Sequence, residues 1–193
     1  DDLTYHFVWE VADTVGTQNF TLSTGTDVVG NLVIEAPTSG AEIQVNYPQA
    51  LVSMTGGWNL ISLNVTPTES GNLLYLLKPL QSSLVYVFNE RFKMLRRRPT
   101  GDWSDGVGDW QMTEGYYVKL SGQGEVKIPG KRLKLPIDID LEKGWNIVPF
   151  PFPSDVKMNV DEVFADIIGD VEMVFNEQGS VYLPGGQGFE MRT

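Results

Sequence analysis

The sequence Gly-Trp-Asn occurs twice, at residues 57–59 and at residues 144–146, and the two occurrences are 87 residues apart. A second shared sequence, Val-Phe-Asn-Glu, stands at residues 87–90 and at residues 174–177 with the same spacing. Because both pairs share one spacing without a gap, they indicate a duplicated folding unit. This repeat constrains the fold more strongly than any local motif, since both copies are expected to form the same elements.

Each Gly-Trp-Asn opens the same predicted order of elements: a strand, a Pro-containing loop and a short helix. Asn72 is the predicted cap of the first helix, and Asn159 caps the second with Glu162 as its capping-box partner. The apolar face of the first helix is Leu73, Leu76, Leu77 and Leu80, and that of the second is Val160, Val163, Phe164, Ile167 and Ile168. Two different sequences therefore predict the same local structure.

The fold class follows from the many short apolar segments that alternate with turns. The 193 residues include 20 Gly and 11 Pro, and hydrophobic residues make up 41% of the chain. This pattern predicts a mainly β, β-sandwich-like fold of pseudo-repeated units with a period of 87 residues, each with one short α-helix. No apolar run reaches the ~20 residues of a membrane-spanning helix. The absence of cysteine excludes disulfides and thiolate metal sites.

The repeat predicts three segments. Residues 1–56 form an N-terminal β segment, residues 57–143 a complete first repeat, and residues 144–193 a partial second repeat. Residues 186–193 match residues 106–113 at a spacing of 80 rather than 87, which makes the second repeat seven residues shorter in between.

Both ends of the sequence resemble parts of a repeat. Thr193 ends the second repeat before a counterpart of the strands that close the first one. At the other end, residues 20–25 resemble residues 117–122, and residues 30–34 resemble residues 124–128. We therefore interpret the N-terminal segment as the tail of a repeat.

An unfinished β unit exposes unpaired backbone donors and acceptors, which proteins normally cover. Three arrangements account for the unpaired backbone groups expected in the second repeat. The N-terminal strands complete it within the molecule, they complete the repeat of the next molecule in a filament, or the chain is a piece of a longer array.

The net charge of −11 is unevenly distributed along the chain. Residues 1–77 carry −8, residues 78–134 carry +5, and residues 135–193 carry −8, which sum to −11. Either the fold mixes these charges over one solvated surface, or a basic band faces the acidic surface of a neighbouring domain or subunit. Because the chain is so acidic, we do not expect it to bind nucleic acid, whose phosphates are also negatively charged.

Two sequences carry a resemblance to a known group of proteins: residues 57–63, Gly-Trp-Asn-Leu-Ile-Ser-Leu, and residues 114–118, Glu-Gly-Tyr-Tyr-Val. Over residues 57–193 the chain resembles a Gly-Trp-Asn (GWN) type of β repeat module in large secreted and cell-surface proteins of Bacteroidetes and related bacteria. The resemblance implies an extracellular, non-enzymatic, structural or adhesive role. It implies no catalytic residues.

Catalytic signals are weak. Nucleophilic catalysis by a Ser-His or Cys-His pair needs a histidine, and the only one, His6, lies near the N-terminus in a strand pattern. The chain has many Asp and Glu residues, from which a glycosidase could take its two catalytic carboxylates, but the sequence indicates no particular pair. We therefore expect no enzymatic activity and no cofactor other than calcium.

Calcium is the metal that acidic surface loops favour, because it takes oxygen ligands. A glycine-rich loop spaces three carboxylates that could bind it: Asp102, Asp105 and Asp109. A second set alternates along one face of a strand: Asp138, Asp140 and Glu142. Neither set has EF-hand spacing, and both also fit a plain solvated turn or strand.

Exposed aromatic rings are the usual means by which β-sandwich modules bind sugars. Trp58 and Trp145 recur beside glycine at equivalent positions, which favours a role as core or corner anchors. Trp103 and Trp110 belong to one repeat only and lie in or beside a polar loop, so they are the better candidates for ligand binding.

The leading hypothesis is a non-catalytic extracellular structural or adhesive β module that acts through domain or subunit contacts, including strand complementation in a filament or surface assembly. The alternative is a carbohydrate-binding module of a secreted multidomain protein. The expected partners are neighbouring domains, identical subunits or a glycan.

Overall fold

The computed structural model describes residues 15–19, 25–26, 32–33, 42–152, 156–186 and 190–191. The chain divides into two compact units, the N-terminal unit Asp1–Tyr47 and the main unit Pro48–Thr193. The described residues of the N-terminal unit include two antiparallel strand pairs. These pair β1 (Gly16–Asn19) with β4 (Glu42–Val45) and β2 (Gly25–Thr26) with β3 (Leu32–Val33).

The main unit is built around a five-stranded antiparallel sheet. Its strands, in spatial order, are β10 (Trp103–Asp105), β9 (Met94–Arg97), β8 (Leu84–Phe88), β11 (Tyr116–Leu120) and β6 (Gly57–Ile61). β11 lies between β8 and β6 and pairs with both. Its residues alternate between buried and half-buried, so one face of this sheet is directed into the core and the other outward.

A second, three-stranded sheet has β12 (Gly124–Arg132) between β5 (Gln49–Met54) and β7 (Val65–Pro67). The core joins inward residues of this sheet, such as Val52 and Ile128, to inward residues of the five-stranded sheet, such as Val87 and Val118. The prediction of a mainly β, sandwich-like fold is therefore confirmed.

The two predicted helices are present in equivalent places. They are α1 (Leu73–Leu76) with the 3₁₀ turn η1 (Lys78–Leu80), and α2 (Val160–Val163) with the 3₁₀ turn η2 (Ala165–Ile167). The Asn72 side chain accepts a hydrogen bond from Tyr75 N–H at 3.1 Å and caps α1. At α2 the Asn159 N–H donates to Glu162 Oε2 at 3.1 Å, as the capping-box pattern predicts.

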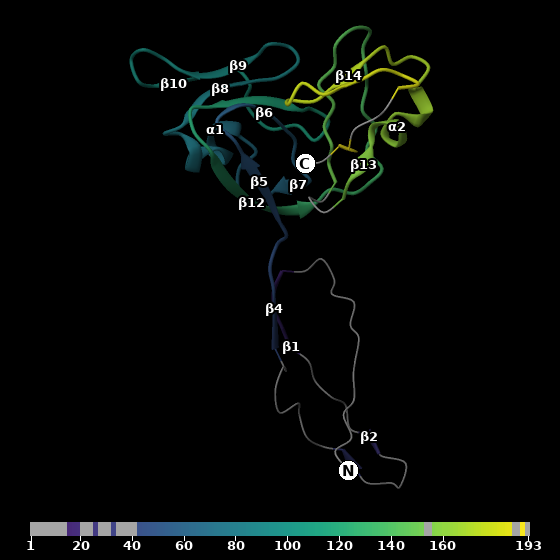
Figure 1. The fold of residues 1–193 in the computed structure, drawn as a ribbon. Coiled ribbons are helices and arrows are strands. Elements are labelled where there is room, and N and C mark those ends of the chain that lie inside the picture. The colour runs from purple at the N-terminus through teal and green to yellow at the C-terminus, as the bar shows by residue number, and fades with distance from the viewer. Residues whose placement is uncertain are drawn as a thin grey trace. The chain divides into compact units, whose positions relative to one another are not determined.

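Four short strands belong to the second repeat. They are β13 (Met158–Asn159), β14 (Val174–Phe175), β15 (Val181–Tyr182) and β16 (Glu190–Met191). β14 pairs with β15 as β8 pairs with β9, because Phe175 faces Val181 and Phe88 faces Met94. Figure 1 shows β14, α2 and β13 together on one side of the main unit and β8, β9 and β10 on the other.

In the last part of the second repeat, strand pairing aligns the two repeats differently from the sequence match. Asn72 forms an antiparallel bridge with Asp109, and Asn159 pairs in the same way with Glu190. The spacing between Asp109 and Glu190 is 190 − 109 = 81 residues, not 80. The shortening of the second repeat is thus six residues, because the strand pairing fixes a register that a short sequence match does not.

The structure also extends each repeat toward the N-terminus. β5 precedes Gly57 and pairs with β12 inside the main unit, and the unit begins at Pro48. Residues 136–141 lie 87 positions after β5 and place Ile137, Ile139 and Leu141 where Ala50, Val52 and Met54 stand in β5. We therefore include residues 48–56 in the first repeat and residues 135–143 in the second.

The second repeat forms fewer strands than its sequence predicts. Residues 136–141 correspond to β5 and residues 144–148 to β6, yet no strand forms there among the described residues. In the first repeat those two strands pair with β12 and β11, respectively. The described part of the second repeat contains no counterpart of either, and a strand without a partner does not form a ladder.

Candidate interaction surface

The Gly-Trp-Asn sequence adopts the same local geometry in both repeats. Gly57 has φ +102° and Gly144 has φ +109°, a region that favours glycine. The Asn59 side chain accepts a hydrogen bond from Thr55 N–H at 2.8 Å and donates to the Thr55 carbonyl at 2.9 Å. Asn146 makes the same two bonds with Glu142, both at 2.8 Å. The asparagine therefore closes the turn that precedes each tryptophan.

The tryptophan in each repeat contacts a phenylalanine edge to face. Trp58 and Phe88 have ring centroids 5.4 Å apart at 74°, and Trp145 and Phe175 are 5.3 Å apart at 75°. We expected the tryptophans to anchor the core or a corner. Instead Trp58 is 42% exposed and Trp145 71% exposed, while the anchor in the first repeat is the buried Asn59.

The outer face of the five-stranded sheet carries two rows of side chains. Cross-strand pairing places Leu60, Tyr117, Phe88 and Met94 in one row and Trp58, Lys119, Tyr86 and Arg96 in the other. Phe88 stacks on Tyr117 with ring centroids 5.2 Å apart, and Lys119 Nζ lies 5.2 Å from the Trp58 ring centroid. The outer face is thus aromatic, with cations between the rings.

The turn between β8 and β9 ends the aromatic row. The Asn89 side chain accepts hydrogen bonds from Arg91 N–H and Lys93 N–H, both at 3.1 Å, and fixes the turn. Phe92 lies at its tip with φ 54° and an exposure of 82%, and its ring stacks on Phe88 at 6.2 Å. A bulky side chain rarely adopts a positive φ.

The turn between β14 and β15 repeats this geometry without the ring. The Asn176 side chain accepts from Gln178 N–H at 3.1 Å and from Ser180 N–H at 2.8 Å. The position equivalent to Phe92 is Gly179, with φ +83°. The turn itself therefore needs a left-handed residue, and glycine satisfies that need.

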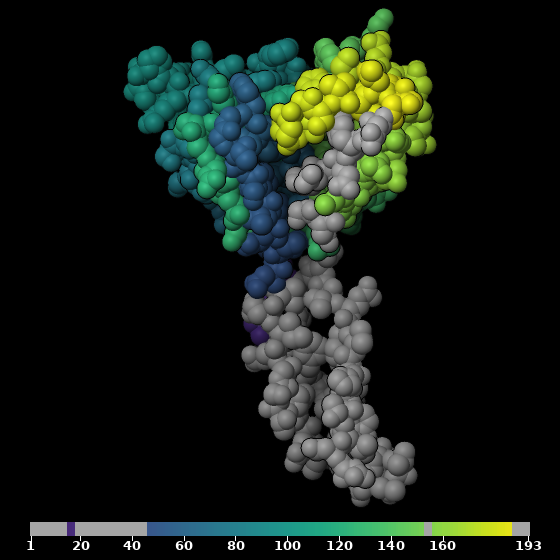
Figure 2. Space-filling view, viewed as in Figure 1, coloured from purple at the N-terminus to yellow at the C-terminus, as the bar shows by residue number. Residues whose placement is uncertain are grey.

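The two repeats contact each other along residues 147–150. Phe150 N–H donates to Ser62 Oγ at 3.0 Å, in a buried position. Ile147 N–H donates to Glu90 Oε2 at 3.4 Å. Figure 2 shows the atoms of the second repeat, green to yellow, beside the strands of the first, blue to teal.

Two tyrosines on neighbouring positions of β11 have raised pKa values. Burial raises the pKa of Tyr117, and the charge of Glu177 in the second repeat raises it further. Burial is also the main reason that the pKa of Tyr116 lies above its usual range, with Glu114 adding to the effect. The hydroxyl of Tyr116 accepts from Gln111 N–H at 2.8 Å, which favours its ionised form and partly offsets these effects.

The second repeat exposes positions that the first repeat buries. Ala50, Val52 and Met54 of β5 are buried in the core. Among the equivalent residues of the second repeat, Ile137 and Ile139 are half-buried and Leu141 is 42% exposed. In the first repeat β12 and β11 pair with these segments, and the described residues of the second repeat contain no counterpart of either strand. An edge of this kind is available for pairing with another strand.

The three carboxylates predicted to bind calcium do not form one cluster. Asp102 pairs with Arg98 at 2.9 Å and accepts a hydrogen bond from Thr100, and the Thr100 hydroxyl is the main reason that the Asp102 pKa is lowered. Among the described residues, no group of three acids is placed to hold a metal ion, and this also covers Asp138, Asp140 and Glu142.

The other two acidic residues, Asp105 and Asp109, stabilise the loop. Asp105 Oδ1 accepts from Gly108 N–H at 2.8 Å, and Asp105 Oδ2 accepts from Asn72 Nδ2 at 2.8 Å. Asp109 forms the backbone bridge with Asn72. Asp105 and Asp109 therefore hold the loop against the start of α1.

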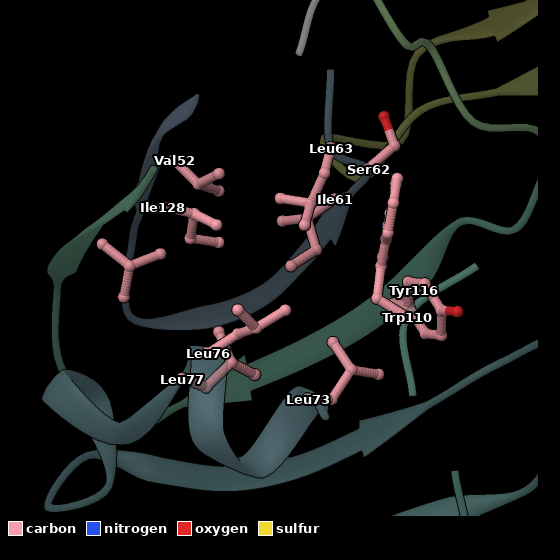
Figure 3. Close-up of a pocket in the computed structure, with 11 residues that line it drawn as sticks. Val52, Ile61, Ser62, Leu63, Leu73, Leu76, Leu77, Trp110, Tyr116 and Ile128 are labelled. Atoms are coloured by element: carbon pink, nitrogen blue, oxygen red, sulfur yellow. The ribbon is translucent and has the colours of Figure 1, made fainter. Parts of the chain in front are cut away.

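The tryptophans predicted to bind sugar are directed to the core. Trp110 is buried, and Trp103 is half-buried against the same core cluster. Figure 3 shows Trp110 with Tyr116 and Leu73 around a small internal cavity, whose volume is about 10 Å³. That space is the size of one water molecule and too small for a sugar. Exposed rings include those of Trp58, Phe92 and Trp145. A strand pattern alone does not distinguish exposed aromatic residues from core residues.

Comparisons with protein-family models, curated proteins and solved structures find no match to the chain. Within the part of the chain that the structure describes, no helix has the length and apolar character to cross a membrane. His6, the only histidine, lies outside the described residues.

Proposed function

We propose that this chain is a non-catalytic structural or adhesive β module of the cell exterior, which joins domains or subunits by strand complementation at its second repeat. The observation that carries the proposal is the difference between the two repeats. The Asn146 turn has the geometry of the Asn59 turn, but residues 136–148 around it have no strand partner among the described residues. A partner strand pair of the β11 and β12 type fits there.

The first repeat indicates which residues such a partner needs. β11 supplies Tyr116, Val118 and Leu120 to the core and forms backbone pairs with both β6 and β8. β12 supplies Val126 and Ile128 and pairs with β5. The expected occupant is therefore an extended segment in which apolar residues alternate with polar ones.

The extracellular setting rests on the resemblance of residues 57–63 and 114–118 to modules of secreted and cell-surface proteins. The carbohydrate-binding alternative rests on Trp103 and Trp110, whose rings belong to the core region of the first repeat. Contacts between protein segments are thus the better-supported function.

A labelled peptide with the sequence of residues 114–132 tests the proposal when it is titrated into the 193-residue chain. We expect saturable binding by fluorescence anisotropy and slowed amide hydrogen exchange at residues 136–148 and at β14. The matched control peptide carries Val118→Asp and Val126→Asp, which place charges at two fully buried positions. It should bind at least tenfold more weakly.

Two results would contradict the proposal. One is an absence of binding at peptide concentrations well above those that saturate typical strand-addition complexes. The other is slowed exchange confined to the first repeat, because the peptide would then be replacing β11 and β12 rather than completing the second repeat.

A further inference from the structure

Phe92 combines two features that the fold does not require. Its backbone has a positive φ of 54°, which is unfavourable for a bulky side chain, and its ring is 82% exposed. The same turn in the second repeat has Gly179, which adopts φ +83° without steric cost. Because glycine serves the turn, the ring of Phe92 has a purpose other than folding.

The surroundings of Phe92 indicate what it contacts. Its ring stacks on Phe88 and so extends the aromatic row beyond the edge of the sheet. Arg91 and Lys93, which flank it in the turn, are both exposed. The tip is thus an apolar ring between two cations, and the complementary surface is apolar with acidic neighbours.

The second repeat of this chain carries such a surface. Trp145 is 71% exposed and Phe175 is 41% exposed, and the two rings contact each other. The exposed carboxylates Glu142 and Glu177 stand three and two residues away from these rings in the sequence. Residues 135–193 carry eleven acids and three bases, whereas residues 78–134 carry six acids and eleven bases.

We propose that Phe92 of one molecule docks on the Trp145 and Phe175 pair of a second copy of this chain, with Arg91 and Lys93 facing its acidic residues. This inference rests on the proposed function as a contact module and names a partner for it. The two surfaces are different and occur on every molecule, so the contact is head-to-tail and links successive molecules into an open filament or a closed ring.

Analytical ultracentrifugation over a range of concentrations and salt tests the inference. The wild-type chain should associate, and association should weaken as salt screens the charges. Phe92→Gly should raise the dissociation constant at least tenfold while the melting temperature stays equal or rises. Trp145→Ala should weaken association to a similar degree. Tyr75→Ala, which removes an exposed ring on α1 that belongs to neither surface, should leave association unchanged.

Mixing the two variants gives the sharper test. Phe92→Gly retains the acidic aromatic pair, and Trp145→Ala retains the basic tip, so an equimolar mixture should form one-to-one dimers although each variant alone is a monomer. A wild-type chain that stays monomeric at every concentration would overturn the inference, and so would a mixture that stays monomeric. If the chain is monomeric but binds the peptide of residues 114–132, the inference is wrong and the proposed function stands.

Discussion

The carbonyl oxygen of Ile147 accepts a hydrogen bond from Gly115 N–H at 3.4 Å, and a Cβ atom placed on Gly115 would lie 2.7 Å from Ile147 Cγ2. This contact joins the two repeats directly before β11. The absence of a side chain at residue 115 therefore lets the second repeat approach the first.

Gly115→Ala should loosen the contact between the repeats. The added methyl group would lie 2.7 Å from Ile147 Cγ2, a methyl group on the stiff β-branched part of the side chain, so Ile147 has to move away to make room for it. We expect faster hydrogen exchange at residues 147–150, with little change in the strands of the first repeat. Unchanged exchange at residues 147–150 would show that this glycine does not position the second repeat.

Gly130→Ala should destabilise the main unit by about 2–3 kcal/mol, since overpacking against backbone is not easily relieved. A Cβ atom there would lie 2.5 Å from the Thr66 carbonyl oxygen and 2.8 Å from Val65 Cβ. Gly122→Ala is the matched control, because nothing lies within 4 Å of its Cβ position. Urea denaturation should separate the two variants, and equal stabilities would contradict the close packing of β12 on β7.

The two asparagines of the Gly-Trp-Asn turns should differ in their effect on stability. Asn59→Ala removes a buried side chain together with its two hydrogen bonds to the Thr55 backbone and should cost about 2 kcal/mol. Asn146→Ala removes the same bonds at an exposed turn and should cost less than about 1 kcal/mol. Urea denaturation measures both. Equal costs would mean that burial of the first turn contributes nothing.

Tyr116 should make the stability of the main unit sensitive to alkaline pH. Its pKa is raised in the folded state, mainly by burial, so its contribution is complete below the unfolded pKa of ~10. That contribution is lost as pH rises further, because only the unfolded state then releases the proton readily. Tyr116→Phe should flatten the dependence of the unfolding free energy on pH above about 10. Parallel curves for wild type and variant would contradict this.

The sequence predicts much of the fold because the repeat spacing and the helix signals are local. Asn72 and Glu162 take the capping roles that their spacing indicates, and the leucine stripe of α1 is buried. The strand pattern of Gly57-Trp58-Asn59 is less informative. Alternation separates two faces but does not say which is inside, and here the polar Asn59 is buried while Trp58 is exposed.

The candidate site depends on partners, which sequence periodicity does not describe. Residues 144–148 repeat the sequence pattern of β6, yet they form no strand without a counterpart of β11 among the described residues. One sequence feature indicates the positive φ of Phe92: at the 87-residue spacing it aligns with Gly179. Trp103 and Trp110 stand beside a polar loop in sequence but pack on the core in space.

The most direct measurement adds strands of the β11 and β12 type to the second repeat. Because Glu190 takes the place of Asp109, a copy of the sequence of residues 113–132 joined after Thr193 continues the repeat in register. Hydrogen exchange on this extended chain should be slowed at residues 136–148 and at β14, and it should no longer bind the peptide of residues 114–132. Exchange at those residues equal to that of the 193-residue chain, with peptide binding unchanged, would contradict the proposal that the second repeat accepts strands of this type.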